Sequence, residues 1–280
     1  MDIASAIEQN IAAALAEDIG SGDLTAQLIP AGQSATASVI CRQKAILCGR
    51  PWFEACFRRL DPQVEFIWYT DEGQCVGADQ ILCEIRGDAR ALLSAERPAL
   101  NFLQTLSGTA TATAHYVEAV KGIGIHLMDT RKTLPGLRVA QKYAVRIGGG
   151  VNQRIGLFDG ILIKENHIAA AGGIGQALEL ARRLAPSGTP IQIEVESLYQ
   201  LEQALASGAT LILLDNFDLK TLRRAAKLTE GRATLEASGG ISLANVRAVA
   251  QTGVDRISIG SLTKDVLAVD LSMRFAFTGR

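Results

Sequence analysis

The sequence lacks the features that mark secreted or membrane-spanning proteins. Its five cysteines are odd in number, have no C-x-x-C spacing and all lie in the first third of the 280 residues. We therefore expect reduced, mostly buried thiols and a cytoplasmic location, not a disulfide framework or a metal site. No apolar run reaches the roughly 18 residues of a membrane span, and the acidic, mixed N-terminal segment is unlike a secretory signal.

An excess of one charge is also missing. The formal net charge is −1, so nothing global favours a nucleic-acid or membrane partner. The chain has no G-x-S-x-G, no G-x-G-x-x-G after a strand and no His/Cys constellation with zinc spacing. What is present is ordinary globular material, 48% hydrophobic and 20% charged, enough for one large domain or two of moderate size.

Residues 36–86 are predicted to form an antiparallel sheet. Short apolar segments alternate there with glycine-containing turns, which is the pattern of strands joined by tight hairpins. A helix is expected over residues 95–120, interrupted at Ser107-Gly108. Pro98 is tolerable in it because we expect the residue to fall in the first turn.

A different pattern begins near Ile125. Short apolar strands recur and are mostly separated by helical segments, which indicates βα units around a parallel sheet, in a number that suits a barrel. Chemistry in such barrels takes place at the carboxyl ends of the strands. The residues at these ends are Asp129, Lys164, Glu196, Asp215, Ser238 and Gly260.

One of these strands has polar residues along a single face. The period of two places Gln192, Glu194 and Glu196 on the same side. Carboxylates that face a barrel interior are costly unless cations or a metal pair with them. Together with Asp215, these carboxylates could hold Mg²⁺ and substrate oxygens, or they could form an ion-pair network, and the residues alone leave both open.

Seven cationic residues and a single acid lie between residues 131 and 164. Three have the spacing of a helix face that is either solvated or part of a site: Arg138, Lys142 and Arg146. Four others lie beside glycine-rich or strand-end positions: Arg131, Lys132, Arg154 and Lys164. Converging cations of this kind need anionic ligands, so the cluster predicts a polyanionic substrate.

Two loops in consecutive βα units have the composition of phosphate-binding loops. Ser238-Gly239-Gly240 follows one strand and precedes a helix that we expect Ser242 to cap, and Gly260-Ser261 follows the last barrel strand. Backbone amides at such places bind phosphate oxygens, although single turns of this composition are common. Among the histidines, His167 is the better candidate for a site.

Longer segments resemble a known family. DTRKTLPGLRVAQKYAVRIGGGVNQRIGLFDGILIKENHI, from Asp129 to Ile168, is similar to the signature region of the quinolinate phosphoribosyltransferases. The segments EDIGSGDLTA, ERPALNFLQTLSGTAT, IEVES, LLDNF, EASGGI and ISIGSLTKDV match in the expected order. The resemblance covers nearly the whole chain.

This resemblance implies a fold of the α/β class with three parts. We expect an N-terminal α+β open sandwich domain over residues 1–112 and an incomplete, about seven-stranded α/β barrel over residues 113–268. Residues 269–280 are expected to form a strand that returns to the N-terminal domain.

It also implies an activity and a set of partners. The family transfers the phosphoribosyl group of phosphoribosyl pyrophosphate to quinolinate with decarboxylation, giving nicotinate mononucleotide, carbon dioxide and pyrophosphate, and it uses Mg²⁺. It belongs to NAD biosynthesis. The expected assembly is a homodimer with shared active sites, without a nucleic-acid or membrane partner.

The family's functional residues carry over onto matching positions. The cations expected to bind quinolinate and the phosphates are Arg131, Lys132, Arg154 and Lys164, joined by Arg97 from a neighbouring subunit. Glu194 and Asp215 would serve the metal and the ribose, and with Lys132 and Lys164 they form the expected catalytic set. The residues expected to bind the 5-phosphate are Ser238, Gly239, Gly240, Gly260 and Ser261.

One position departs from the family pattern. The family often has Asn-His-Arg where this chain has Asn152-Gln153-Arg154. Gln153 can donate a neutral hydrogen bond but cannot give up a proton as an acid does, so we expect it to position quinolinate and not to act as an acid. The alternatives are a paralogue of the same fold acting on another pyridine carboxylate, such as nicotinate, and a catalytically silent metabolite-binding module.

Overall fold

The computed structural model describes residues 1–277, and the chain divides into two compact units. The first unit comprises Met1–Ala114, Thr133–Gly149 and the described part of Thr263–Arg280. The second comprises His115–Lys132 and Gly150–Leu262. The expected C-terminal strand includes residues 278–280, which lie outside the described residues.

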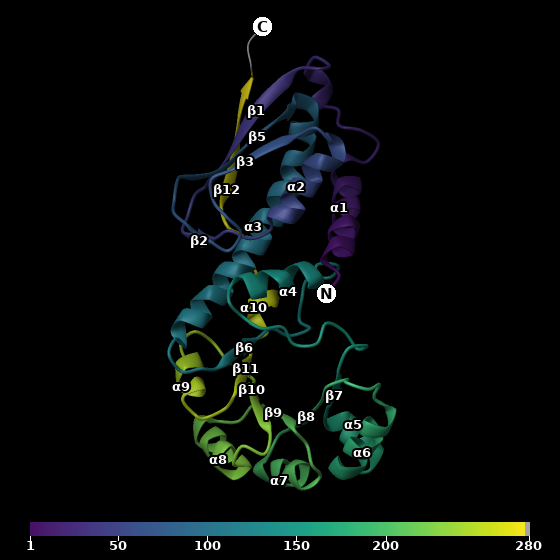
Figure 1. Cartoon of the computed structure of the whole chain (residues 1–280), viewed down its shortest axis with the longest axis vertical. Helices are drawn as coiled ribbons and strands as arrows, with labels where there is room; N and C mark the ends of the chain where they lie inside the picture. Colours follow the sequence, from purple (N-terminus) through teal and green to yellow (C-terminus); the bar gives the residue numbers. More distant parts are fainter. Residues whose placement is uncertain (278–280) are drawn as a thin grey trace. The chain divides into compact units, whose positions relative to one another are not determined.

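The first unit is built on an antiparallel sheet of four strands, in the order β12-β1-β5-β3 (Figure 1). The strands are β1 (Ser34–Cys41), β3 (Glu65–Trp68), β5 (Gln80–Asp88) and β12 (Leu271–Phe277). A separate pair joins β2 (Ala45–Ile46) and β4 (Cys75–Val76). The predicted antiparallel sheet is confirmed, and β12 brings the end of the described chain back to β1.

Helices cover this sheet and close a hydrophobic core. They are α1 (Ile3–Ile19), α2 (Arg50–Leu60), most of α3 (Ala89–Ala119) and α4 (Arg138–Ile147), with the short 3₁₀ helix Ala26–Leu28. The α2 side chains Trp52, Phe53 and Phe57 are almost fully buried and belong to the same core as Leu82 and Ile85 of β5. Burial of these large side chains stabilises the unit.

The long helix α3 differs from the prediction. It begins at Ala89 and continues through Ser107 and Gly108 without a break, so Pro98 lies inside the helix and not in its first turn. A Cβ at position 108 would clash with the carbonyl oxygen of Leu267. Gly108 is therefore a point of close backbone packing inside a continuous helix, and tertiary contact overrides its weak helix propensity.

The second unit contains a parallel sheet of six strands among the described residues, in the order β6-β11-β10-β9-β8-β7. Its strands are β6 (His126–Met128), β7 (Ile161–Ile163), β8 (Ile191–Val195), β9 (Leu211–Asp215), β10 (Thr234–Ser238) and β11 (Arg256–Ser258). The α/β class is confirmed. The count is six where about seven were expected, because next to β6 only Val151 pairs, through a single bridge to Met128.

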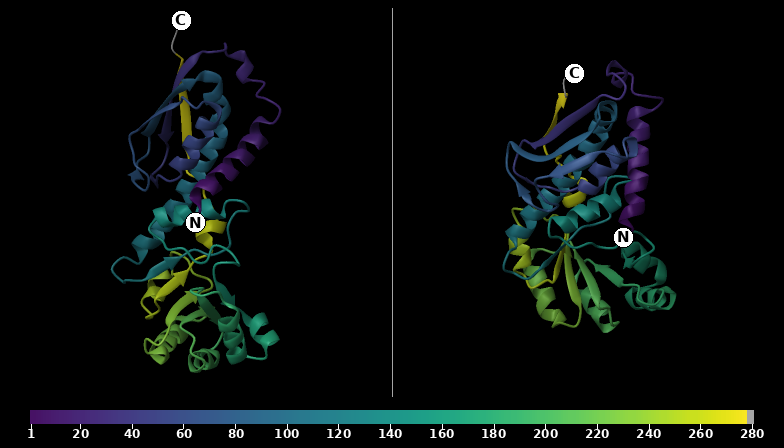
Figure 2. Two further views of the ribbon diagram at one scale, coloured as in Figure 1. Left: turned by 45° about the vertical axis from the view of Figure 1, so that its right-hand side comes forward. Right: turned by 45° about the horizontal axis from the view of Figure 1, so that its top comes forward.

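Helices connect successive strands of this sheet, as βα units require. They are α5 (Glu165–Ala171), α6 (Ile174–Leu184), α7 (Leu198–Ala206), α8 (Leu219–Thr229) and α9 (Val246–Ala250), with α10 (Ser261–Lys264) after β11. Figure 2 shows α7 and α8, in green, on the outer side of the strands. The opposite face is therefore the one that can present side chains to the barrel interior.

The cysteines are free thiols, and four of the five are buried. Burial raises the pKa of Cys56 from its ordinary 9.0 to about 12, so this thiol stays protonated at neutral pH. The prediction of buried core thiols is confirmed for all but Cys75, which is exposed. A separate finding is that no helix in the described part of the chain is long and apolar enough to cross a membrane.

Candidate active site

An ion pair joins the ends of β7 and β8. Lys164 follows β7 directly, and its Nζ lies 3.0 Å from Oε2 and 3.3 Å from Oε1 of Glu194 on β8. The Glu194 side chain is only 10% exposed, whereas the Lys164 side chain is 45% exposed. Lys164 therefore supplies the cation that the inward-facing carboxylate was expected to need. It also remains partly open to solvent, where an anion can approach.

A second carboxylate comes from the adjacent strand. Glu194 pairs in register with Leu213 of β9, and Asp215 follows two residues later, so the two carboxylates lie on the same face of the sheet. Asn216 has a positive φ of 56° and donates from Nδ2 to Asp215 at 2.9 Å. Its backbone N–H also donates to the Ser238 carbonyl at 2.9 Å. Asn216 thus holds Asp215 beside the end of β10.

Two of the predicted cations, Arg131 and Arg154, lie near each other in the second unit, and Lys132 lies against the second glycine loop. Burial and then the positive charge of Arg131 lower the pKa of Arg154, while Asp159 opposes this effect. The stem of Lys132 runs along Gly260, where a Cβ would come within 3.1 Å of Lys132 Cδ. One predicted cation, Lys132, and the second glycine loop therefore meet at the carboxyl ends of the strands.

Two buried or partly buried carboxylates organise the chain on either side of Arg154. Asp129, which is fully buried, accepts from Asn152 Nδ2 at 2.6 Å and from the backbone N–H of Gln153 at 2.8 Å. Asp159 accepts from the backbone N–H groups of Ile155 and Gly156, both at 2.8 Å. These contacts fix the loop that carries Gln153 and Arg154.

The Gln153 side chain points into the barrel. Its Nε2 donates to Glu236 Oε1 at 2.8 Å and Oε2 at 2.7 Å, and to Gln192 Oε1 at 3.1 Å. Gln192 Nε2 in turn donates to Glu236 at 3.0 Å. Gln192 and Glu236 are 8% and 1% exposed. The amide hydrogens of Gln153 thus face this internal cluster in the structure.

The first glycine loop has backbone conformations that favour glycine. Gly239 and Gly240 have φ of 100° and 60°, and a Cβ at position 239 would clash with Asn216. The expectation that Ser242 caps the next helix is wrong, because α9 begins at Val246 and a turn separates it from β10. Any phosphate contact here would therefore come from loop amides and not from a helix terminus.

Three further residues considered from the sequence lie in different surroundings: His167, Lys142 and Arg97. The ring nitrogen Nδ1 of His167 accepts from the backbone N–H of Lys164 at 3.0 Å, so His167 shapes the start of α5. Lys142 is completely buried, so a solvated helix face is the wrong interpretation for it. Arg97 is exposed on α3 in the first unit, well after the start of that helix.

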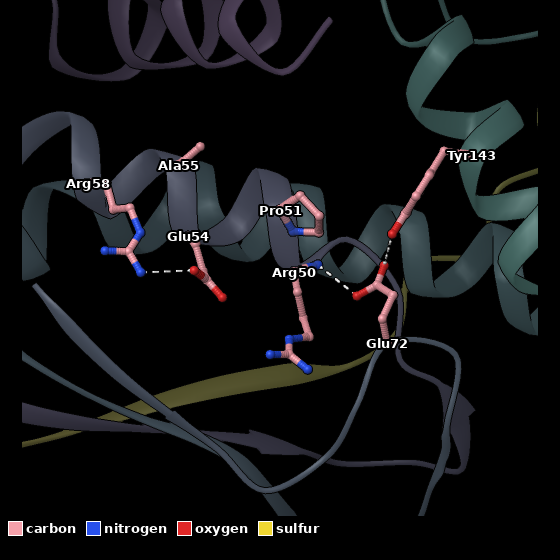
Figure 3. Close-up of a pocket in the computed structure, with 7 residues that line it drawn as sticks. All are labelled: Arg50, Pro51, Glu54, Ala55, Arg58, Glu72 and Tyr143. Carbon is pink, nitrogen blue, oxygen red and sulfur yellow. Dashed lines mark hydrogen bonds and ion pairs between the residues drawn. The ribbon is translucent and has the colours of Figure 1, made fainter. Parts of the chain in front are cut away.

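A cavity of about 430 Å³ lies within the first unit, away from every predicted site residue (Figure 3). Its charged groups are engaged by neighbours. Glu72 accepts from the backbone N–H groups of Gly49 and Arg50 and from the Tyr143 hydroxyl at 3.0 Å, and Arg58 pairs with Glu54 at 3.1 Å. Burial, followed by Glu72, raises the pKa of Tyr143. Neighbouring residues therefore already pair with the charged groups Glu72 and Arg58 in the cavity wall.

The donor set of the second unit suits a hard divalent cation that substrate helps to bind. Among the described residues, no three His, Cys, Asp or Glu side chains are arranged to hold a metal by themselves. Mg²⁺ usually takes one or two carboxylates, several waters and substrate phosphate oxygens. Glu194 and Asp215, on one face of neighbouring strands, fit that requirement.

Sequence reasoning missed Glu236 and Asn216 as residues of the site. The signal for Glu236 was present, since alternation along β10 puts it on the same face as Ser238, two residues later. Its pairing with Gln153, 83 residues away along the chain, was not visible. The signal for Asn216 was its residue type, because asparagine directly after a strand-end aspartate is able to adopt a positive φ and form a tight turn.

A parallel α/β sheet with clustered cations, two strand-end carboxylates and glycine loops defines an enzyme class that handles phosphorylated, anionic substrates. The sequence profile of "Quinolinate phosphoribosyl transferase, C-terminal domain" matches residues 109–274, and that of "Quinolinate phosphoribosyl transferase, N-terminal domain" matches residues 23–107. The chain belongs to the quinolinate phosphoribosyl transferase family.

Individual relatives agree with this assignment. The chain is 45% identical over 257 residues to a probable nicotinate-nucleotide pyrophosphorylase (carboxylating) of Bacillus subtilis (strain 168), covering 92% of this chain and 89% of that protein. It is 41% identical over 278 residues to the nicotinate-nucleotide pyrophosphorylase (carboxylating) of Mycobacterium leprae (strain TN), covering 96% of each. The solved structure of the nicotinate-nucleotide pyrophosphorylase from Francisella tularensis superposes with a TM-score of 0.93 at 44% identity, covering 97% of this chain and 96% of that one.

Proposed function

We propose that this protein transfers the phosphoribosyl group of phosphoribosyl pyrophosphate to quinolinate, with loss of carbon dioxide, giving nicotinate mononucleotide and pyrophosphate in NAD biosynthesis. The observation that carries the proposal is the joint match of both family domains across residues 23–107 and 109–274. The cationic cluster supports it, because quinolinate is a dicarboxylate and the cosubstrate carries several phosphates.

Each predicted group has a task in this reaction. Arg131, Lys132, Arg154 and Lys164 bind the substrate anions and hold the pyridine nitrogen near the anomeric carbon. Positive charge develops on the ribose as pyrophosphate leaves, so cations at the leaving group and carboxylates at the ribose lower the barrier. The N-ribosylated ring is cationic and stabilises the electron pair that remains on the ring carbon when the carbon–carboxylate bond breaks and carbon dioxide leaves. A proton taken up from solvent then replaces the lost carboxylate.

We assign Mg²⁺ to Glu194 and Asp215, and the 5-phosphate to Ser238, Gly239, Gly240, Gly260 and Ser261. When bound, the metal would supply positive charge to the pyrophosphate group. Before substrate enters, Lys164 neutralises Glu194 at 3.0 Å. The loop amides at Gly239 and Gly240, with their positive φ, are able to turn toward an anion as a backbone nest does.

The proposed assembly is a homodimer with shared active sites, in the cytoplasm. Arg97 is exposed on the first unit, consistent with a role toward another subunit. Leu157 and Phe158 are adjacent in the chain and 73% and 81% exposed, and a partner would remove them from water. Free cysteine thiols are the state that a reducing compartment maintains.

A product assay tests the proposed reaction. Purified protein with quinolinate, phosphoribosyl pyrophosphate and Mg²⁺ should release pyrophosphate and carbon dioxide in equal amounts and form nicotinate mononucleotide. Nicotinate in place of quinolinate should give no product. Equal turnover with nicotinate would reassign the enzyme to another pyridine carboxylate, and binding of phosphoribosyl pyrophosphate without pyrophosphate release would identify a silent binding module.

A further inference from the structure

Glu236 is a buried carboxylate in the barrel interior. It lies on β10, is 1% exposed, and belongs to the strand that ends in the glycine loop. Among the described residues, the groups that donate to it are the side-chain amides of Gln153 and Gln192. A buried acid that is met by neutral amides is costly, because amides compensate less of its desolvation than a cation does. Its place in the barrel therefore calls for an explanation beyond packing.

The carboxylate dictates the orientation of the Gln153 amide. Both Glu236 oxygens lie within 2.8 Å of Gln153 Nε2 and act as acceptors, so the NH₂ end must face them. The carbonyl end then faces the opposite way. Gln153 Oε1 accepts from the backbone N–H of Arg154 at 3.2 Å. If an amide replaced the carboxylate, either end of Gln153 could face position 236.

Arg154 depends on this orientation for one of its anchors. Its backbone N–H is held by Gln153, and its guanidinium donates to the Gly160 carbonyl at 2.8 Å. The guanidinium also lies close enough to Arg131 to feel its charge, which places Arg154 among cations that repel one another. A cation held in that setting needs rigid support from its own loop.

We propose that Glu236 is a positioning residue that acts through Gln153 to hold Arg154 for a carboxylate of the pyridine substrate. The inference rests on the assignment of Arg154 to quinolinate under the proposed function. It also gives Gln153 a task different from a direct hydrogen bond to quinolinate, since the amide hydrogens of Gln153 face Glu236 and Gln192. The series of contacts from Glu236 through Gln153 to Arg154 then links the barrel interior to the cations that bind the substrate.

The Glu236→Gln variant tests the first link. It keeps the size of the side chain and removes the demand for a donor. We expect the KM for quinolinate to rise about tenfold, as when a hydrogen bond to a charged group is lost, while the KM for phosphoribosyl pyrophosphate stays within about twofold. A general loosening of β10 would instead raise both, since Ser238 on the same strand begins the proposed phosphate loop. Equal changes in both, or none, would overturn the proposal.

The second link is tested by a double-mutant cycle with Gln153→Ala. If Glu236 acts through Gln153, adding Glu236→Gln to Gln153→Ala should change the quinolinate KM by less than about twofold, because the interaction is already gone. Independent residues would instead multiply their effects, to about a hundredfold. Multiplied effects would show that Glu236 does not act through Gln153.

Two matched variants keep the result interpretable. Thr229→Val removes another buried hydrogen bond, from Thr229 Oγ1 to the Ala225 carbonyl at 2.9 Å in α8, and should lower stability without changing either KM. A similar quinolinate shift in this variant would reduce the Glu236 effect to general destabilisation. If Glu236→Gln does not fold, Glu236→Asp withdraws the carboxylate by one methylene, and an unchanged quinolinate KM there would also overturn the proposal.

The wild-type enzyme separates failure of this inference from failure of the proposed function. If wild-type protein releases no pyrophosphate and carbon dioxide from quinolinate, the assignment of substrate is wrong, and with it the role given to Arg154. If the wild type turns over and the variants lack the expected KM split, only the role of Glu236 is wrong.

Discussion

Lys164 Nζ lies 3.0 Å from Glu194 Oε2, in an ion pair that joins the ends of two neighbouring parallel strands. The two residues differ in exposure, since the Glu194 side chain is 10% exposed and that of Lys164 is 45% exposed. The pair therefore neutralises a buried carboxylate while it leaves a cation at the surface of the site. When substrate binds, an anionic group can replace Glu194 as the partner of Lys164, and a cation can replace Lys164 as the partner of Glu194.

Lys164→Ala and Lys132→Ala should each nearly abolish turnover and keep the native fold, because neither residue belongs to the hydrophobic core. Lys164→Ala should also lower stability, because it leaves the buried Glu194 carboxylate without its cation. We expect kcat/KM to fall by about 30-fold to several thousandfold, equivalent to about 2–5 kcal/mol for a lost desolvated charge contact. Steady-state kinetics and circular dichroism provide the two measurements. Lys121→Ala is the control, since its ion pair with Glu118 is 74% and 71% exposed. Near-normal kcat/KM in either test variant would remove that lysine from the site.

Asp215→Asn and Glu194→Gln should raise the Mg²⁺ concentration needed for half-maximal rate, because hard cations prefer anionic oxygen ligands. A metal titration of initial rates at saturating substrate measures this. Asp218→Asn is a close control, since Asp218 caps α8 by accepting from Thr221 and asparagine caps equally well. Unchanged titrations in both test variants would exclude these carboxylates from metal binding.

Gln153→His should remain active, because an imidazole N–H can donate toward Glu236 as the Gln153 amide does. Gln153→Ala should weaken quinolinate binding and raise its KM by about tenfold, the effect of leaving a buried acceptor without its donor. Initial rates measured over a range of quinolinate concentrations give the KM of each variant. An alanine variant with the wild-type quinolinate KM would contradict any role for this side chain in binding.

Arg97 provides a test of the proposed shared site. Arg97→Ala and Arg131→Ala dimers should each be almost inactive, and subunit exchange should create mixed dimers in which one site has both lesions and the other is intact. Random exchange at equal amounts makes half of the dimers mixed, so activity should recover to about a quarter of wild type. Native mass spectrometry verifies the exchange. Mixed dimers without recovered activity would show that Arg97 does not act across an interface.

Buried thiols predict a loss of stability in alkaline solution. The folded pKa of Cys56 is raised to about 12 from an ordinary 9.0, so the unfolded state releases its proton first. Stability from this group is complete below pH 9 and falls as pH rises through the window up to about 12, by at most about 1.4 kcal/mol per pH unit. Urea unfolding between pH 8 and about 10 measures the slope. Cys56→Ala should make the slope shallower by the share of one thiol, while Cys41, Cys48 and Cys83, whose pKa values burial also raises, keep the rest. An unchanged slope in Cys56→Ala would contradict the assignment.

Much of the second unit could be predicted from the sequence because the signals are local. The alternation of apolar residues and the polar residue that ends each strand placed Lys164 directly after β7. The same signals placed Asp215 and Ser238 at the ends of β9 and β10, as observed. The need of buried Glu194 for a cation followed from its position on an inward face, and Lys164 meets it. Parallel strands share one carboxyl edge, so the convergence of these residues followed from their strand positions alone.

Only the tertiary structure decided the rest, because those features depend on segments that meet across long stretches of chain. The break expected at Gly108 does not occur. Glycine is needed there because the Leu267 carbonyl packs against α3 and leaves no room for a side chain. The helix that Ser242 was expected to cap begins only at Val246. The Glu236–Gln153 contact, between residues 83 apart, exists because the parallel sheet brings β10 beside the loop that Asp129 anchors. Propensity and periodicity report what each segment prefers by itself, whereas burial and hydrogen bonding between distant segments settle which preferences survive.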